Sequence, residues 1–161
     1  MKTDAEINLK LLVIDDEEQN LGFIESALQQ PGLEILTSTD PEAGLALFRE
    51  KRPEIVLLDL VMPKLNGMDL MEQIIASDPG AQVILMTGYY SVESAVDAIR
   101  KGASDYLTKP LDVEALRHRV FALINEQRSR SFATQLDRQM VDTFQLEGIV
   151  GRSPLIMDVF A

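Results

Sequence analysis

Five short apolar runs recur along the first two thirds of the chain, each separated from the next by a stretch with helical spacing. The third and fourth runs are apolar at nearly every position, which is typical of strands buried on both faces of a parallel sheet. Strands that alternate with helices predict an α/β fold, (βα)5, built as a doubly wound open parallel sheet with helices on both faces. The runs are Leu9–Ile14, Leu33–Leu36, Ile55–Leu60, Val83–Met86 and Asp105–Leu107.

The intervening stretches carry the spacing and the start signals of helices. Apolar residues recur every three or four positions, as on one face of a helix. Asp40-Pro41 is typical of a helix start, Asn66-Gly67 marks a turn before a helix over Met68–Ser77, and Asp112 is placed to cap the last helix. The apolar faces comprise Leu21, Ile24 and Leu28; Leu70, Met71, Ile74 and Ile75; Val92, Ala95, Val96 and Ile99; and Leu116, Val120 and Leu123.

The pattern changes after residue 124. No proline or glycine interrupts the chain from Leu111 to Glu147, so the last helix is expected to continue as a C-terminal helical extension. Within 125–145, apolar residues recur every fourth position, but the coiled-coil pattern lapses at Gln127 and Arg130. We favour a dimer-forming linker helix, a coiled coil that makes a homodimer, over a plain linker. The apolar residues of this extension are Phe132, Leu136, Met140 and Phe144.

Composition narrows the class of protein. The 161 residues hold one domain and an appendage, and the absence of cysteine excludes disulfides and thiolate metal sites. No apolar run is long enough to span a membrane and no signal-peptide core precedes Lys10, so we expect a cytoplasmic protein without membrane contact. With 26 acidic against 15 basic residues, the net charge of −11 argues against DNA contact from this segment.

Chemically competent side chains follow four of the five apolar runs. Ligands of open α/β sheets bind beyond the carboxyl ends of the strands, so these side chains are expected to meet there. Singly, each has an ordinary explanation: an acidic pair caps a helix, a threonine favours a strand and a lysine is solvated. Asp59 is harder to dismiss, because an aspartate among apolar residues needs compensation for burial. The set comprises Asp15 and Asp16, Asp59, Thr87 and Lys109.

The electrostatics of this set favour a divalent cation. Three carboxylates about 4 Å apart repel by roughly 4 kcal/mol per pair at an effective dielectric constant of 20, and Lys109 offsets only part of that. Mg²⁺ is the ion that usually shares a few carboxylates with a phosphate. Asp59 is then placed to act as a nucleophile toward a phosphoryl group.

Residues 9 to about 124 closely resemble the receiver domains of two-component response regulators. The resemblance rests on the acidic pair Asp15-Asp16, on Asp59 before Met62-Pro63, on Thr87-Gly88 and on Lys109-Pro110. It implies a receiver domain over 1–124 with the flavodoxin-like strand order 2-1-3-4-5. It also implies a signalling domain rather than an enzyme.

The same resemblance assigns roles to individual residues. Asp15, Asp16, Asp59 and the main-chain carbonyl of Val61 would hold Mg²⁺, and Asp59 would accept a phosphoryl group from a sensor histidine kinase. Thr87 and Lys109 would contact that group, and Tyr106 would be the switching aromatic, although a half-buried strand tyrosine explains it equally well. The Lys109-Pro110 bond is expected to be cis. Tyr89 and Tyr90 lie where they would gate the site or simply be surface aromatics.

The C-terminal tail resembles the opening of the ATPase domain in NtrC-type sigma-54-dependent transcriptional activators. The match is Gly148-Ile-Val-Gly151-Arg-Ser153-Pro154 with Met157 and Phe160. The phosphate-binding motif Gly-x-x-x-x-Gly-Lys-Ser/Thr is absent, so these residues should not hydrolyse ATP. We therefore expect 146–161 to be the truncated start of an AAA+ ATPase domain, whose assembly the receiver and linker control in the full-length protein.

Three alternatives use the same residues differently. A haloacid dehalogenase-type, aspartate-dependent phosphatase needs the same groups but places its nucleophile on the first strand, whereas here the acidic pair comes first. A flavodoxin-like cofactor module would cradle a phosphate in the loop where Asp15 and Asp16 stand, and they would repel it. A phosphorylation-independent dimerisation module would leave the intact set of site residues unexplained.

Overall fold

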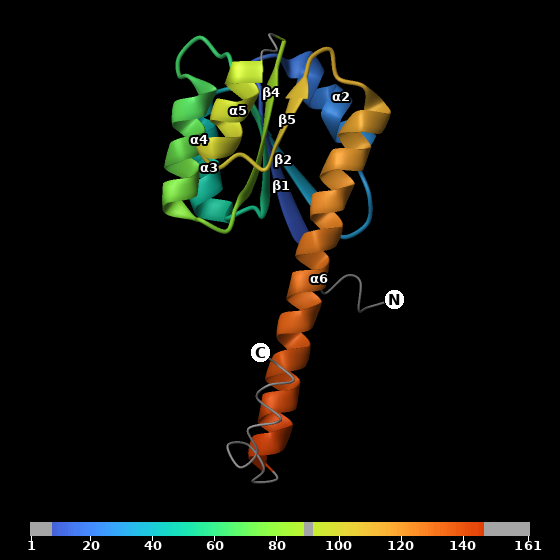
Figure 1. The fold of residues 1–161 in the computed structure, drawn as a ribbon. Helices are drawn as coiled ribbons and strands as arrows, with labels where there is room; N and C mark the ends of the chain where they lie inside the picture. The colour runs from blue at the N-terminus through green and yellow to red at the C-terminus, as the bar shows by residue number, and fades with distance from the viewer. Residues whose placement is uncertain (1–7, 89–91, 147–161) are drawn as a thin grey trace. The chain divides into compact units, whose positions relative to one another are not determined.

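The computed structural model describes residues 8–88 and 92–146, with side chains as far as residue 130. Helices and strands alternate along the chain (Figure 1). Tyr89, Tyr90 and residues 147–161 lie outside the described residues. The elements are β1 (Leu9–Ile14), α2 (Glu18–Leu28), β2 (Leu33–Ser38), α3 (Pro41–Lys51), β3 (Ile55–Asp59), α4 (Gly67–Ser77), β4 (Gln82–Thr87), α5 (Val92–Arg100), β5 (Asp105–Thr108) and α6 (Val113–Leu146).

The strands form one parallel sheet in the order β2-β1-β3-β4-β5, which confirms the predicted fold class and strand order. The central strands β1, β3 and β4 are buried at almost every position, as their apolar sequences predict. The edge strand β2 is only partly buried and continues two residues beyond the predicted run. Parallel pairing brings the carboxyl ends of all five strands to one edge of the sheet.

Two apolar layers cover the two faces of the sheet. Alternate residues of β1 point to opposite faces: Leu11 and Val13 belong to one layer, and Leu12 and Ile14 to the other. Helices α2 and the first part of α6 cover the first face, whereas α3, α4 and α5 cover the second (Figure 1). As far as residue 130 in α6, the buried residues are Leu116, Val120 and Ile124, whereas the predicted Leu123 is half-buried.

Helix α5 forms as predicted, but most of its apolar face does not join the core. Its side chains at Val92, Val96 and Ile99 are 66%, 44% and 49% exposed, whereas Ala98 is fully buried against the second face of the sheet. Helical spacing therefore located the element but not the side of it that packs. Small residues on the inward side let the helix lie close to the sheet, and the larger apolar side chains face outward.

Several helix starts follow the predicted capping. Asp40 Oδ2 accepts a hydrogen bond from the Ala43 amide, and Asp112 Oδ2 accepts one from the Ala115 amide. Asn66 Oδ1 accepts from the Met68 amide, so α4 begins at Gly67, one residue before the predicted start.

The chain divides into two compact units, residues 1–124 and 125–161. The first contains the sheet and both layers, and the second contains the remainder of α6, which is helical as far as Leu146. Among the residues that the structure describes, no helix is both long and apolar enough to cross a membrane.

Candidate functional site at the carboxyl end of the sheet

Five of the predicted site residues lie at the carboxyl edge of the sheet. Asp15 and Asp16 directly follow β1, Asp59 is the last residue of β3 and Thr87 is the last residue of β4. Lys109 directly follows β5, and its amide donates to the Thr87 carbonyl at 2.7 Å. The strand register places Asp59 beside Met86 and Thr87 beside Thr108, so residues far apart in sequence become neighbours.

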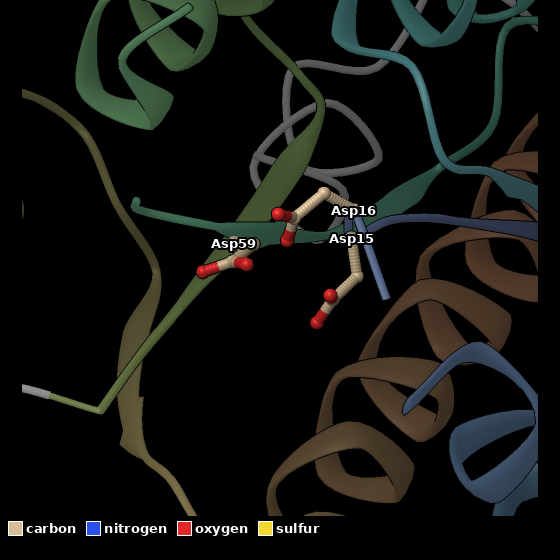
Figure 2. A group of neighbouring side chains, drawn as sticks. All are labelled: Asp15, Asp16 and Asp59. Carbon is tan, nitrogen blue, oxygen red and sulfur yellow. The ribbon is translucent and has the colours of Figure 1, made fainter. Parts of the chain in front are cut away.

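Three carboxylates gather at this edge. One oxygen each from Asp15, Asp16 and Asp59 lies within 4.8 Å of the others, and Figure 2 shows the three side chains together at the ends of β1 and β3. Asp15 and Asp59 are buried, whereas Asp16 is exposed. Within this separation each ionised pair repels by at least about 3.5 kcal/mol at an effective dielectric constant of 20, so the cluster is electrostatically costly without a cation.

Lys109 supplies part of the compensating charge. Its Nζ lies 2.9 Å from Asp15 Oδ2 and 3.2 Å from Asp59 Oδ2, and its side chain is only 19% exposed. Burial lowers the pKa of the Lys109 ammonium, but the hydrogen bond that it donates to Asp15 and the charges of both aspartates outweigh that and raise the pKa overall. Lys109 is therefore a permanent cation at the site, and one positive charge faces three carboxyl groups.

The carboxyl of Asp59 is harder to ionise than that of an ordinary aspartate. Burial raises its pKa to about 6, an effect that the charge of Lys109 reduces and the charge of Asp15 reinforces. The Val61 amide donates to Asp59 Oδ1 at 3.3 Å and stabilises the ionised form. At neutral pH Asp59 is mostly ionised, but its negative charge is only partly offset by Lys109. An ionised carboxylate that a bound cation can stabilise further is suited to act as a nucleophile.

Asp15 is fixed by more partners than the sequence indicates. Its Oδ1 accepts from the Glu17 amide at 2.9 Å, and its Oδ2 accepts from Asn20 Nδ2 at 3.3 Å in addition to Lys109. Asn20 also donates to Glu17 Oε1 at 2.8 Å. Sequence reasoning missed Asn20, whose one signal is a polar amide on the first turn of the helix that follows an acidic pair.

The other predicted residues lie on β4, β5 and the loop after β3. Thr87 is 1% exposed at the end of β4, and Tyr106 is half-buried in β5, packed against the second layer of the core. The Lys109-Pro110 bond is cis, as predicted. Val61 is 67% exposed on the loop after β3, where its amide meets Asp59.

The donor set fits a hard divalent cation. Carboxylate oxygens from three aspartates converge, two of them buried, and a lone lysine leaves net negative charge. Oxygen ligands of this kind are those that Mg²⁺ prefers. The cluster is open on one side, because Asp16 is exposed and a depression borders Lys109. That depression is lined by Glu17, Gln19, Asn20, Phe23, Lys109, Pro110 and Leu111.

Sequence comparison places this chain among bacterial regulatory proteins. The chain is 31% identical over 150 residues to the regulatory protein AtoC of Escherichia coli (strain K12). The matched segment covers 93% of this chain and 32% of AtoC. The chain is 32% identical over 148 residues to the DNA-binding transcriptional regulator NtrC of Salmonella typhimurium (strain LT2), covering 92% and 31% of the two chains. The chain thus spans about a third of the length of these relatives.

Comparison with solved structures also identifies receiver domains as similar. A response regulator receiver domain from Clostridium thermocellum superposes with a TM-score of 0.68 at 36% identity, covering 74% of this chain and 97% of the other. The family model of the response regulator receiver domain matches residues 11–121. This range contains the acidic pair, Asp59, Thr87 and Lys109, which lie at the carboxyl ends of β1, β3, β4 and β5. The chain therefore belongs to the response regulator receiver domain family and is related to NtrC-type transcriptional regulators.

Proposed function

We propose that Asp59 accepts a phosphoryl group from a phosphohistidine of a sensor histidine kinase. The observation that carries this proposal is the contact of one ammonium, Lys109 Nζ, with both Asp15 and Asp59 at the carboxyl edge of the sheet. That contact gathers a buried carboxylate, a fixed cation and further carboxylates around one small space. Membership of the receiver family supports the assignment.

In the proposed reaction an Asp59 carboxylate oxygen attacks the phosphorus atom. A bond forms between that oxygen and phosphorus, and the bond between phosphorus and the histidine nitrogen of the kinase breaks. The imidazole leaves with the electron pair and takes up a proton from water, so atoms and charge balance. Lys109 is placed to contact the transferred oxygens, and Thr87 is proposed to donate its hydroxyl to the same group.

Mg²⁺ is the proposed cofactor. Asp15, Asp16 and Asp59 would hold it through their carboxylates, and Val61 through its main-chain carbonyl. When bound, Mg²⁺ neutralises the acidic cluster and stabilises charge on phosphoryl oxygens. The chain itself keeps Asp15 oriented through Glu17 and Asn20, and keeps Lys109 charged.

Phosphorylation is proposed to act as a switch through Thr87 and Tyr106. The added group carries a charge of about −1.5 to −2 and draws the Thr87 hydroxyl toward it, and Tyr106 then turns inward behind Thr87. The surface formed by α5, β5 and α6 changes as a result. Val92, Val96 and Ile99 already expose apolar area on this surface, which supports its use as a contact surface.

The wider role proposed here draws on the relatives. Residues 125–145 would form a linker helix that pairs in a homodimer, and 146–161 would begin an AAA+ ATPase domain of a sigma-54-dependent activator, whose oligomeric state the receiver controls. This segment would not contact DNA itself, because its net charge is −11. The proposed location is the cytoplasm, where a sensor kinase presents its phosphohistidine.

Beryllofluoride, a non-covalent mimic of the phosphoryl group, provides a test. We expect one equivalent to bind in the presence of Mg²⁺, as measured by fluorine NMR, and none to bind Asp59→Asn. Binding that persists in Asp59→Asn would contradict the assignment of Asp59. Absence of binding in the wild type would favour the phosphorylation-independent dimerisation module, and steady release of phosphate from esters would favour the phosphatase.

A further inference from the structure

Helix α4 begins directly on the main chain of Asp59 and Leu60. Its first residue, Gly67, is buried, and the Gly67 amide donates to the Leu60 carbonyl at 2.8 Å. A Cβ atom at this position would lie 2.6 Å from Leu60 Cα and 2.9 Å from the Leu60 carbonyl oxygen, and closest of all to the Asp59 carbonyl oxygen. A Cβ atom essentially never lies within 3.0 Å of a non-bonded heavy atom, so something would have to move.

The nature of the neighbours decides how costly the movement is. At Gly67 all three are backbone atoms of the strand end, which have no rotamer to escape into. At Gly44, by contrast, the Cβ would meet only side-chain atoms, those of Ile14. At Gly22 nothing lies within 4 Å. Of these three positions, only Gly67 lies directly against the backbone that carries the phosphoacceptor.

That backbone is held from both sides. On the sheet side the Leu60 amide donates to the Met86 carbonyl at 2.7 Å, and on the helix side the Leu60 carbonyl accepts from Gly67. The next residue, Val61, donates its amide to Asp59 Oδ1 at 3.3 Å. Displacement of Leu60 would therefore change both the direction of the Asp59 carboxyl and the position of the Val61 carbonyl.

We propose that Gly67 is a positioning residue for the phosphoryl-accepting and cation-binding site, because only a residue without Cβ lets α4 close onto Asp59 and Leu60. The inference rests on the proposed function of Asp59 and adds a residue that touches neither the phosphoryl group nor the cation. Its effect is transmitted through the backbone from Leu60 to Val61.

Helix propensity alone predicts the opposite. Gly67 does not adopt the left-handed conformation, unlike Gly32 and Gly102, so alanine fits its backbone angles. Replacing a helical glycine with alanine usually stabilises by about 0.4–1 kcal/mol where the angles allow it. The contact with Asp59 and Leu60 reverses that expectation, and the reversal makes the proposal specific.

The experiment compares Gly67→Ala with two other glycine variants of the full chain. Gly102→Ala is strained, because Gly102 has φ +118° and lies at the end of α5, before the amino end of β5 and away from the site. Gly22→Ala fills open space on α2. Unfolding by urea ranks the stabilities, Mg²⁺ titration followed by amide NMR gives cation affinity, and intact mass after acetyl phosphate gives the rate of phosphoryl uptake.

We expect Gly67→Ala to weaken Mg²⁺ binding by about 10- to 100-fold and to slow phosphoryl uptake by a similar factor. The Leu60 and Val61 amide resonances should shift before any Mg²⁺ is added. Gly102→Ala should lose stability yet keep wild-type Mg²⁺ affinity and uptake. Gly22→Ala should gain stability slightly and keep the wild-type affinity and uptake. Loss of cation affinity by Gly102→Ala equal to that of Gly67→Ala would reduce the effect to general destabilisation and overturn the proposal.

A second variant guards against failure of Gly67→Ala to fold. Asn66→Ala removes the side-chain cap at the Met68 amide, which loosens the start of α4 without adding atoms beside Leu60. It should weaken Mg²⁺ binding several-fold in the same direction. Wild-type Mg²⁺ affinity in Gly67→Ala, or in Asn66→Ala if Gly67→Ala does not fold, would overturn the proposal. Absence of phosphoryl uptake in the wild type would instead reject the proposed function, because the Mg²⁺ and amide measurements do not depend on phosphorylation.

Discussion

The Lys109 ammonium lies 3.2 Å from the Asp59 carboxylate, across 50 positions of sequence. The same nitrogen lies 2.9 Å from Asp15 Oδ2. One side chain therefore joins the ends of β1, β3 and β5, and its charge is the main compensation for two buried carboxyl groups.

Replacement of Lys109 by alanine should destabilise the folded protein and slow phosphoryl uptake. In Lys109→Ala the buried carboxyl groups of Asp15 and Asp59 lose their partner, so the pKa of Asp59 should rise above its present value of about 6. Without Mg²⁺ at pH 7.5 we expect a loss of about 2 kcal/mol in the free energy of unfolding, measured with urea. Phosphoryl uptake should slow by about 100-fold.

Lys64→Ala is the matched control for that loss. The Lys64 ion pair with Asp40 also measures about 3 Å, but the lysine is 69% exposed and solvent screens the pair, so removing it should cost much less than removing Lys109. Equal losses for Lys64→Ala and Lys109→Ala would contradict the role assigned to burial.

Stability should depend on pH through Asp59. The folded pKa of about 6 lies above the unfolded value of about 4, so between these pH values the folded protein holds a proton that the unfolded chain has lost. Stability of the metal-free protein should therefore fall as pH rises from about 4 to 6, by an amount on the order of 3 kcal/mol. Asp59→Asn cannot ionise and should escape this loss.

Urea unfolding in chelator checks the pH prediction. Asp59→Asn should be more stable than wild type at pH 7 and close to it at pH 4. A difference between the two proteins that is the same at both pH values would contradict the raised pKa of Asp59.

Asp16 offers a clean test of cation binding. It is exposed, so Asp16→Asn should fold with little change in stability, yet it removes one carboxylate from the cluster. Mg²⁺ at about 100 times its dissociation constant should stabilise the wild type by about 2.7 kcal/mol and the variant by much less. Asp97→Asn, which removes an exposed carboxylate on α5, should respond to Mg²⁺ as the wild type does. An unchanged Mg²⁺ response in Asp16→Asn would exclude it as a ligand.

Arg117, on α6, should stabilise residues 1–124 by its hydrogen bond to the C-terminal end of α2. Its Nε donates to the Ala27 carbonyl at 2.8 Å, at the C-terminal turn of α2, a turn that contains no basic residue of its own. Arg117→Ala should therefore lower the free energy of unfolding by about 1–2 kcal/mol. Arg119→Ala, which removes an exposed ion pair with Asp105, should cost less. The reverse order in urea unfolding would contradict this assignment.

The sequence predicted the sheet well because its signals are local. Each central strand is a short apolar run with a polar residue at its carboxyl end, and the parallel arrangement then brings Asp15, Asp59 and Lys109 to one edge. Neither the buried environment that raises the pKa of Asp59 nor the contact from Lys109 is visible in a local window. Both arise only when distant strands pair.

Two features escaped prediction for identifiable reasons. The spacing of Val92, Val96 and Ile99 identified a helix, but spacing does not say which side meets the sheet, and the small Ala98 packs there instead. Gly67 was expected to belong to a turn before the helix, whereas it is the first residue of α4 and lies against the backbone of Asp59 and Leu60. Its role depends on a contact between elements and therefore has no local signature.

The most direct test of the central claim is the intact mass of the wild-type chain and of Asp59→Asn after incubation with acetyl phosphate and Mg²⁺. The account predicts a gain of one phosphoryl group per wild-type chain, none in Asp59→Asn, and loss of the gain when Mg²⁺ is chelated beforehand. Phosphorylation of Asp59→Asn to the wild-type extent, or none in the wild type with Mg²⁺ present, would contradict it.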